Sequence, residues 1–178
     1  MTELNARSSV MDLVSGYGFA RQGYPVRGLF SIPFVGLSSN GIPMYNINGK
    51  ITSTDIDFQT RDNIDYLKYE GPTDPTITGS FGNIFTYKAF KLNVFITYSF
   101  GNVVRLNPCF NYQYSDLSSM PREFKNRWTV PGDEKHTNIP AIISKRQYED
   151  NKDLMYAYNA YNYSTAVSYT HLRAHETG

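Results

Sequence analysis

Apolar and polar residues alternate most regularly between positions 91 and 100. The odd positions are mostly polar, with Phe95 as an exception, and the even positions are all apolar: Leu92, Val94, Ile96, Tyr98 and Phe100. Residues 81–88 alternate in the same way just before them. A period of two is typical of a β-strand with two different faces, and the short connection predicts an antiparallel hairpin with strands at residues 79–88 and 91–105.

The segments on either side of this hairpin show no such regularity. Residues 23–78 are rich in Gly, Pro, Asn, Asp and Ser, and residues 106–165 are again long and irregular. Long irregular segments are uncommon in compact domains. We therefore expect poorly packed loops around the hairpin, and a compact closed core enclosing both segments would contradict the interpretation of the chain as a fragment of a larger protein.

Two all-β architectures fit a long hairpin. In a soluble β-sandwich its apolar face lies in a core, and base rates favour this architecture on the alternation alone. In an outer-membrane barrel the apolar face meets lipid, with short turns at one end and long extracellular loops at the other. The long irregular segments match the second pattern, so they favour a partial transmembrane antiparallel β-barrel with few strands.

One short loop helix is expected in the second irregular segment. Ser119 is a suitable N-terminal cap, and Pro121 suits the first turn because its missing N–H is not needed there. Met120, Phe124 and Trp128 then share one face at a spacing of four residues.

Aromatic and arginine side chains near this helix are candidates for contacts with a ligand or a partner, since such residues are enriched at interfaces. The candidates are Arg122, Arg127, Trp128, Tyr158 and Tyr161. For Trp128 the alternative is an anchor that packs the helix onto its loop. For the tyrosines the alternative is an aromatic girdle at a membrane surface.

Composition narrows the classes of function. The chain has 178 residues, the length of one domain or of a piece of a larger protein. Its 17 basic and 16 acidic residues give a net charge of +1, so nothing in the charge suggests a nucleic-acid partner. No apolar run reaches the roughly 18 residues of a membrane-spanning helix. A mean hydropathy of −0.44 is compatible with a barrel whose lumen and loops are polar.

Catalytic and metal-binding patterns are absent from the sequence. Cys109 is the single cysteine, which excludes an internal disulfide and a cysteine-based metal site. The aspartates at positions 55, 57, 62 and 65 lack the glycine and glutamate of a helix–loop–helix calcium site. We expect no enzymatic activity, no catalytic residue, no metal and no cofactor.

The end of the chain differs in origin from the rest. Residues 167–177 read VSYTHLRAHET and resemble the conceptual translation of a transposase-type sequencing-library adapter. We expect residues 167–178 to be a non-native tail behind an authentic segment of residues 1–166. His171 and His175, four residues apart, are therefore no metal pair, and deleting residues 167–178 should change neither fold nor binding.

Seven blocks of the sequence carry a family resemblance. They are GYPV at 23–26, LFS at 29–31, YEGPTDP at 69–75, YSFGNVVRLNP at 98–108, MPREFKNRW at 120–128, VPGDE at 130–134 and AYNAYNYSTA at 157–166. In this order, over residues 16–166, they resemble the SusC/RagA family of TonB-linked outer-membrane transporters (TonB-dependent receptors).

The resemblance implies the later part of a large β-barrel in the cell outer membrane. It further implies uptake of glycans or peptides, a SusD-like surface lipoprotein as partner, and energy from the TonB complex through N-terminal parts that this chain lacks. Because we find no signal peptide, plug domain or closing C-terminal strand, we expect a fragment. A soluble, aromatic-rich β-sandwich that binds glycan is the alternative.

The alternation also assigns the two faces of the hairpin in such a barrel. Outer-membrane strands alternate between lipid-facing and lumen-facing positions. Asn93, Thr97 and Ser99 should face the lumen. The lipid-facing residues should be Leu92, Val94, Ile96 and Tyr98.

Overall fold

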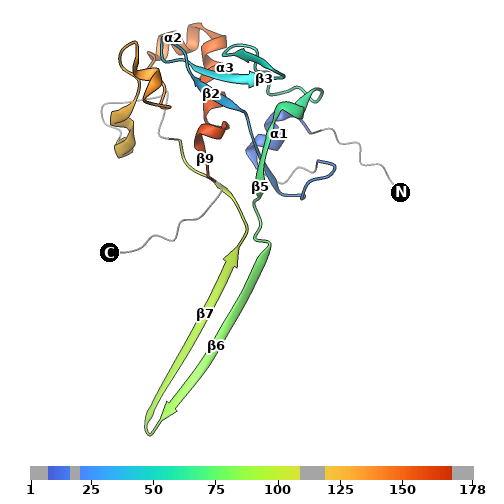
Figure 1. Cartoon of the computed structure of the whole chain (residues 1–178), viewed down its shortest axis with the longest axis vertical. Coiled ribbons are helices and arrows are strands. Elements are labelled where there is room, and N and C mark those ends of the chain that lie inside the picture. The colour runs from blue at the N-terminus through green and yellow to red at the C-terminus, as the bar shows by residue number, and fades with distance from the viewer. Residues whose placement is uncertain (1–7, 17–20, 109–118, 170–178) are drawn as a thin grey trace.

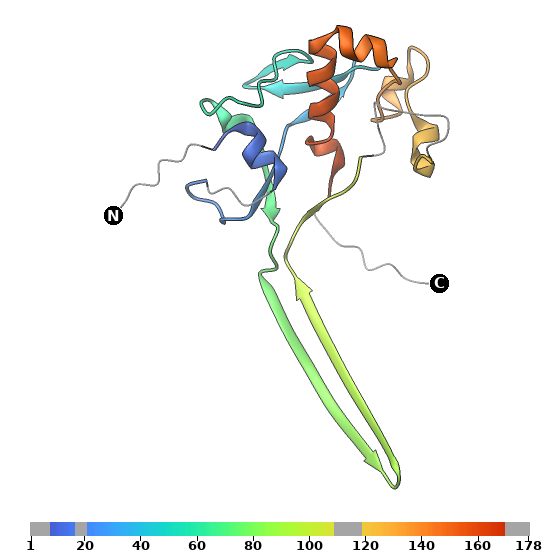
Figure 2. The same cartoon turned by 180° about the vertical axis from the view of Figure 1, so that it is seen from behind.

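One long β-hairpin projects from a head of short helices and small sheets (Figure 1; Figure 2 from behind). This computed structural model describes residues 8–16, 21–108 and 119–169. Within these ranges more residues lie in strands than in the three short α-helices. The sheet-rich content agrees with the predicted all-β class.

The hairpin consists of β6 (Ile77–Tyr87) and β7 (Phe90–Phe100), each eleven residues long. The strands pair antiparallel without a bulge, from Ile77 opposite Phe100 to Tyr87 opposite Phe90. A two-residue turn joins them, with Lys88 in the left-handed region at φ 51°. The predicted hairpin is confirmed.

The predicted second strand was too long at its C-terminal end. Gly101 has a φ of 84°, in the left-handed region that glycine adopts without strain, and ends β7. Residues 104 and 105 form a separate short strand, β8 (Val104–Arg105).

The described residues of the head form three small antiparallel sheets. β1 (Gly28–Ser31) pairs with β5 (Lys68–Pro72), with a shift in register between Leu29 and Phe30. A second sheet has the order β2 (Phe34–Leu37), β3 (Pro43–Ile47), β4 (Lys50–Thr52). The third is a two-residue ladder between β8 and β9 (Ser168–Tyr169).

Each α-helix begins at a polar cap. Ser9 and Asp12 form a capping box at α1 (Val10–Ser15), and Ser144 forms one with Gln147 at α2 (Lys145–Asp150). The Asn151 side chain accepts two backbone N–H groups at the start of α3 (Lys152–Tyr161). Four 3-10 turns complete the described elements: η1 (Ile64–Tyr66), η2 (Arg122–Asn126), η3 (Asp133–Lys135) and η4 (Thr165–Val167).

The loop helix is shorter than predicted. Only η2 forms, after Pro121 and without a side-chain cap, and Arg127 is already extended at ψ 160°. Ser119 therefore caps nothing here, and Trp128 lies beyond the helical turn. A 3-10 turn is used in such short pieces because its hydrogen-bond geometry is poorer than that of an α-helix.

The two irregular segments pack against each other, so the expectation of poorly packed loops was wrong. One buried cluster combines α1 with residues of both segments: Val10, Leu13, Val14, Phe30, Ile32, Tyr45, Ile56, Phe58, Leu67 and Ala160. A second contains Phe124, Tyr148, Tyr158, Tyr161 and Val167. Phe34 packs against both clusters, and the buried Tyr45 hydroxyl donates to the Ala157 carbonyl at 2.6 Å. The head thus has a core of its own.

Candidate functional site: the hairpin and its base

The register of the hairpin places the apolar residues of both strands on one face. Residues directly opposite each other in an antiparallel pair share a face. Every position of this face except Gly79 and Asn83 is apolar: Ile77, Phe81, Phe85, Tyr87, Phe90, Leu92, Val94, Ile96, Tyr98 and Phe100. We call this set the apolar face.

No described part of the head covers the apolar face. Its large side chains are between 44% exposed (Tyr98) and 81% exposed (Phe90), and Val94 is half-buried. Contiguous exposed apolar surface of this kind marks contact with a membrane or a partner. The structure therefore brings the four predicted lipid-facing residues onto one open surface: Leu92, Val94, Ile96 and Tyr98.

The other face of the hairpin is mainly polar. Its polar members are Thr78, Ser80, Thr86, Lys91, Asn93, Thr97 and Ser99. Phe95 and Ile84 are the apolar exceptions. A Cβ atom added at Gly82 would lie 2.9 Å from Cδ2 of Phe95, so the ring rests against the glycine directly opposite it.

Two backbone hydrogen bonds close the base of the hairpin. The N–H of Thr76 donates to the Phe100 carbonyl at 3.0 Å, and the N–H of Val103 donates to the Pro72 carbonyl at 2.8 Å. Gly71 lies so close to Val103 that a Cβ atom there would approach Cγ1 of Val103 to 2.8 Å. The incoming and outgoing segments therefore run side by side into the head.

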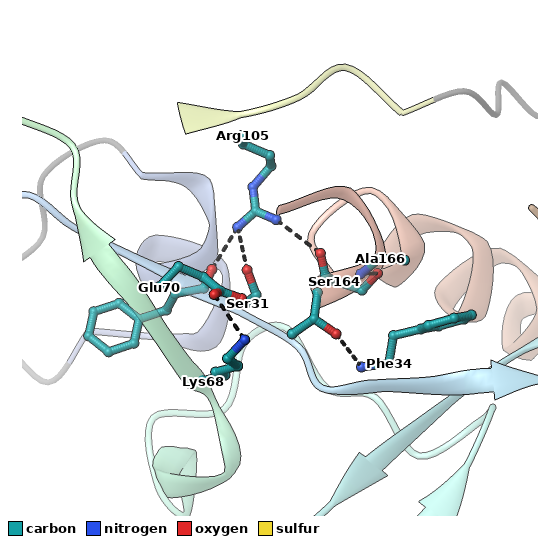
Figure 3. Close-up of polar contacts among 9 residues, drawn as sticks. Ser31, Phe34, Lys68, Glu70, Arg105, Ser164 and Ala166 are labelled. Atoms are coloured by element: carbon teal, nitrogen blue, oxygen red, sulfur yellow. Dashed lines mark hydrogen bonds and ion pairs between the residues drawn. The ribbon is translucent and has the colours of Figure 1, made fainter. Parts of the chain in front are cut away.

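Arg105 joins the outgoing segment to the head (Figure 3). Its Nη2 donates to the Phe30 carbonyl at 2.6 Å, to the Val14 carbonyl at 3.2 Å and to Oγ of Ser31 at 3.3 Å. Its Nη1 donates to the Ser164 carbonyl at 3.5 Å. Loss of solvation in this site lowers the pKa of Arg105 to about 10, opposed by the charge of the Glu70 carboxylate and by Tyr163. At neutral pH the guanidinium stays charged.

Glu70 carries the opposite charge on the incoming segment. Its side chain is only 2% exposed, and one carboxylate oxygen lies 3.1 Å from Nζ of Lys68. The other oxygen, Oε1, is buried without a hydrogen-bond partner among the described residues. Figure 3 shows Glu70 on β5 close to Ser31, one of the residues to which Arg105 donates a hydrogen bond.

Trp128 is held by its own loop and packs on the head. Its indole Nε1 donates to Oε2 of Glu134 at 3.1 Å, and a Cβ atom added at Gly41 would lie 2.6 Å from its ring. The ring is half-buried. This placement is that of a packing anchor. Arg127 stacks at 5.1 Å over the ring of Phe124.

Two carboxylates fix the loop that follows Trp128. Oδ2 of Asp133 accepts the backbone N–H groups of Thr129 at 2.9 Å and Val130 at 3.0 Å, and these bonds lower the pKa of Asp133. The pKa of Glu134 is lowered by its own backbone N–H, by that of residue 132 and by the indole N–H. Both groups favour the ionised form in the folded loop.

The other predicted contact residues separate into surface and core. Arg122 is exposed and remains accessible to a partner. Tyr158 and Tyr161 are 1% and 3% exposed and pack in the second core cluster. The Tyr158 hydroxyl donates to the Ala141 carbonyl at 2.9 Å, and burial raises the pKa of Tyr158. As placed here, these two tyrosines stabilise the head and offer no surface to a ligand.

Sequence reasoning missed Arg105 and Glu70. Both lie inside blocks that carry the family resemblance, but neither has a spacing or a neighbour that distinguishes it from a surface charge. Their significance arises only when β5, β8 and the segment at Ser164 meet.

Over the described ranges no helix is long and apolar enough to cross a membrane. The same ranges hold no group of three His, Cys, Asp or Glu side chains placed to bind a metal ion. His171, His175 and Cys109 lie outside the described residues. No protein-family model and no curated protein matches the chain.

Proposed function

We propose that the chain is part of an outer-membrane TonB-dependent transporter of the SusC/RagA type. In this proposal β6 and β7 are two neighbouring strands in the wall of its transmembrane β-barrel. The supporting observation is the hairpin itself. Its strands have eleven residues each, and a strand needs about 9–11 residues to cross a bilayer. Its apolar residues share one uncovered face.

The two faces then have different surroundings. The apolar face lies against lipid, and the face with Asn93, Thr97 and Ser99 lines the lumen. The short turn at Lys88 lies on the periplasmic side, where such barrels have their tight turns. The head, which holds both long segments, lies on the extracellular side.

The transport role follows from the resemblance to the family. The chain would take part in importing glycans or peptides with a SusD-like lipoprotein, using energy from the TonB complex, and would not act as an enzyme. Arg122, Arg127 and Trp128 lie in the head, on the side proposed to meet that partner. The sequence blocks at residues 16–166 support these parts of the proposal, and the fold adds only the hairpin.

The core of the head counts against one part of this proposal. Residues of both irregular segments share a buried cluster, which is not expected of loosely packed loops in a fragment. The proposal therefore rests on the hairpin. In the alternative, a soluble glycan-binding β-sandwich, a second sheet must cover the apolar face. The described residues provide no such sheet against β6 and β7. The open face therefore favours lipid as its surroundings.

Cysteine labelling of the intact transporter that carries this segment tests the proposal. Single cysteines replace Val94 and Thr97 in a background in which Cys109 is serine. A lipid-soluble reagent should label position 94, and a water-soluble reagent should label position 97. A cysteine at Lys88 serves as a control, because the turn should be open to water. Water-soluble labelling of position 94 with protection of position 97 would overturn the assignment.

A further inference from the structure

The outer edge of β7 is open along the length of the strand. β6 and β7 form a sheet of two strands, so within the described residues no strand pairs with the other side of β7. An open edge presents a row of backbone N–H and C=O groups, which are costly to leave unpaired away from water. We propose that this edge pairs antiparallel with β7 of a second copy of the chain, with Phe95 opposite Phe95 of that copy at the twofold axis.

β7 lacks most of the features that keep edge strands apart. Natural edge strands are protected by proline, by bulges, by charged side chains or by short length. β7 has eleven residues, pairs with β6 without a bulge, and contains neither proline nor glycine. Its sequence, FKLNVFITYSF, consists largely of aromatic and β-branched residues, which favour strands. Lys91, its single charged residue, is therefore the only feature of β7 that opposes pairing.

The sequence of β7 is self-complementary about Phe95. In an antiparallel pair centred on this residue, each position lies opposite the one equally far on the other side of the centre. The apolar face then pairs residues of like kind: Phe90 with Phe100, Leu92 with Tyr98, and Val94 with Ile96. The polar face pairs Lys91 with Ser99 and Asn93 with Thr97. The two copies therefore match side chain for side chain, and Lys91 does not meet a second lysine.

Other registers of the same pair fit less well. A centre one residue away from Phe95 leaves two residues of each eleven-residue strand without a partner. A centre between two residues places an even position opposite an odd one, so that the apolar face of one copy continues as the polar face of the other. The centre at Phe95 pairs all eleven positions and gives one continuous apolar face.

The outer edge of β6 is less suited to such a pair. β6 contains Gly79 and Gly82, and glycine weakens the interior of a strand. An antiparallel pair of β6 with itself, centred on Gly82, would place Phe81 opposite Asn83 and Gly79 opposite Phe85. These partners do not match in size or polarity, so β7 is the edge that we expect to pair.

The pairing places the two heads at opposite ends of the joined sheet. The hairpin projects away from the head (Figures 1 and 2), and in an antiparallel pair the base of one hairpin lies beside the tip of the other. This inference goes beyond the proposed function, because in a complete barrel wall a neighbouring strand would occupy the same edge. The labelling test of the proposed function concerns the faces of the hairpin and the test below concerns its edge, so either can fail without the other.

Disulfide cross-linking between two variants of the full chain tests the pairing in detergent micelles. Both variants carry Cys109→Ser. One also carries Asn93→Cys, and the other, made heavier by an affinity tag, carries Thr97→Cys; both positions are exposed. The pairing places position 93 of one copy opposite position 97 of the other, at a Cα separation of about 4.5–5.5 Å that a disulfide can span. Oxidation of the mixture should therefore give a mixed dimer, and light scattering of the parent chain should give the mass of two copies.

The matched control replaces Thr97→Cys by Ser80→Cys. Ser80 lies directly opposite Thr97 in the same hairpin, on the same face, and is also exposed. In the joined sheet its Cα atom lies one strand farther from position 93 of the other copy, at about 9–10 Å, which is too far for a disulfide. The mixed dimer should then be about tenfold less abundant. Asn93→Cys oxidised alone should also stay uncross-linked, because its own counterpart lies about 14 Å away.

Four results would overturn the pairing. They are a parent chain with the mass of one copy, no mixed dimer between Asn93→Cys and Thr97→Cys, an equal yield with Ser80→Cys, and equal cross-linking of Asn93→Cys with itself. The third result would indicate unspecific aggregation, and the fourth a different register. If a substitution at position 93 or 97 unfolds the hairpin, Phe95→Cys replaces the two variants. This cysteine should cross-link with its own counterpart at the twofold axis, and a lack of cross-linking there would overturn the pairing as well.

Discussion

The ring of Phe95 covers the backbone of β6 at Gly82, the residue directly across the hairpin from it. An aromatic ring over a cross-strand glycine shields backbone that has no side chain of its own. This contact explains why an apolar residue occurs on the polar face. It also means that Phe95 has a packing role within the hairpin, although 71% of the side chain stays exposed.

Phe95→Ala should loosen the hairpin and leave the head unchanged. A cross-strand pair contributes about 0.2–1 kcal/mol, so the backbone amides of β6 and β7 near Gly82 should exchange faster with solvent by a corresponding factor of about 1.4 to 5. Hydrogen exchange measured by mass spectrometry checks this. Phe90→Ala, at the turn and on the other face, is the control and should not affect that region. Faster exchange in the head would contradict the assignment of Phe95 to the hairpin alone.

Arginine substitution should distinguish the two faces in the intact transporter. Val94→Arg places a charge on the proposed lipid face and should cost about 2–4 kcal/mol if the position lies near the middle of the bilayer. Thr97→Arg places the same charge on the lumen face and should leave the barrel folded, with altered passage of substrate. The yield of assembled protein in outer-membrane fractions measures the difference. Equal losses for both variants would count against the assignment of faces.

The loop after Trp128 should open in acid. Asp133 and Glu134 have folded-state pKa values below their unfolded values of roughly 4. Their contribution to stability is therefore present above that pH and is lost as the pH falls through the folded values. Trp128 is the single tryptophan, so its emission should shift to longer wavelength below about pH 4. In Glu134→Gln the shift should be smaller, and emission that stays constant through this range would contradict the account.

Deletion of the predicted tail should have different effects on the two sides of Tyr169. Val167 is 7% exposed in the second core cluster, and the next two residues pair with β8. Pairing with β8 requires only the backbone N–H and C=O groups of residues 168 and 169, and a valine side chain is suited to a core. A tail that was not selected together with the rest of the chain can therefore still pack against the head. Ending the chain after Tyr169 should leave the unfolding midpoint unchanged. Ending it after Ala166 should cost about 1.5–3 kcal/mol through lost burial of Val167, measured by urea unfolding. Equal stability of the two shortened chains would instead agree with the prediction that all of residues 167–178 can be deleted without effect.

The hairpin was predictable because one regular pattern specifies it. Alternation at residues 91–100 continues long enough to define a strand, its partner and its two faces without reference to the rest of the chain. The early end of β7 was not predictable from alternation, because it depends on the backbone conformation of Gly101.

The head was not predictable because its strands are too short to show a period. β1 to β5 have three to five residues each, and the β1–β5 register shifts at Leu29. Its core depends on contacts between distant parts of the chain, such as Tyr45 with Ala157. The same holds for Arg105, whose acceptors at Val14, Phe30 and Ser164 come together only in the folded head. For Tyr158 and Tyr161 the sequence led to the opposite error. A cluster of aromatic residues was predicted to contact a ligand or partner, but these two side chains are buried in the core.

The closed base of the hairpin makes residues 77–100 a separable module. Because Val103 already donates to the Pro72 carbonyl, the chain leaves the head and returns to it at neighbouring points. Such a geometry tolerates replacement of the intervening segment by a short turn, as natural insertions between adjacent chain ends do. A chain so shortened keeps Glu70, Arg105 and both buried clusters but loses the apolar face. It would provide the head as a water-soluble protein, suited to crystallisation and to the search for a binding partner without detergent.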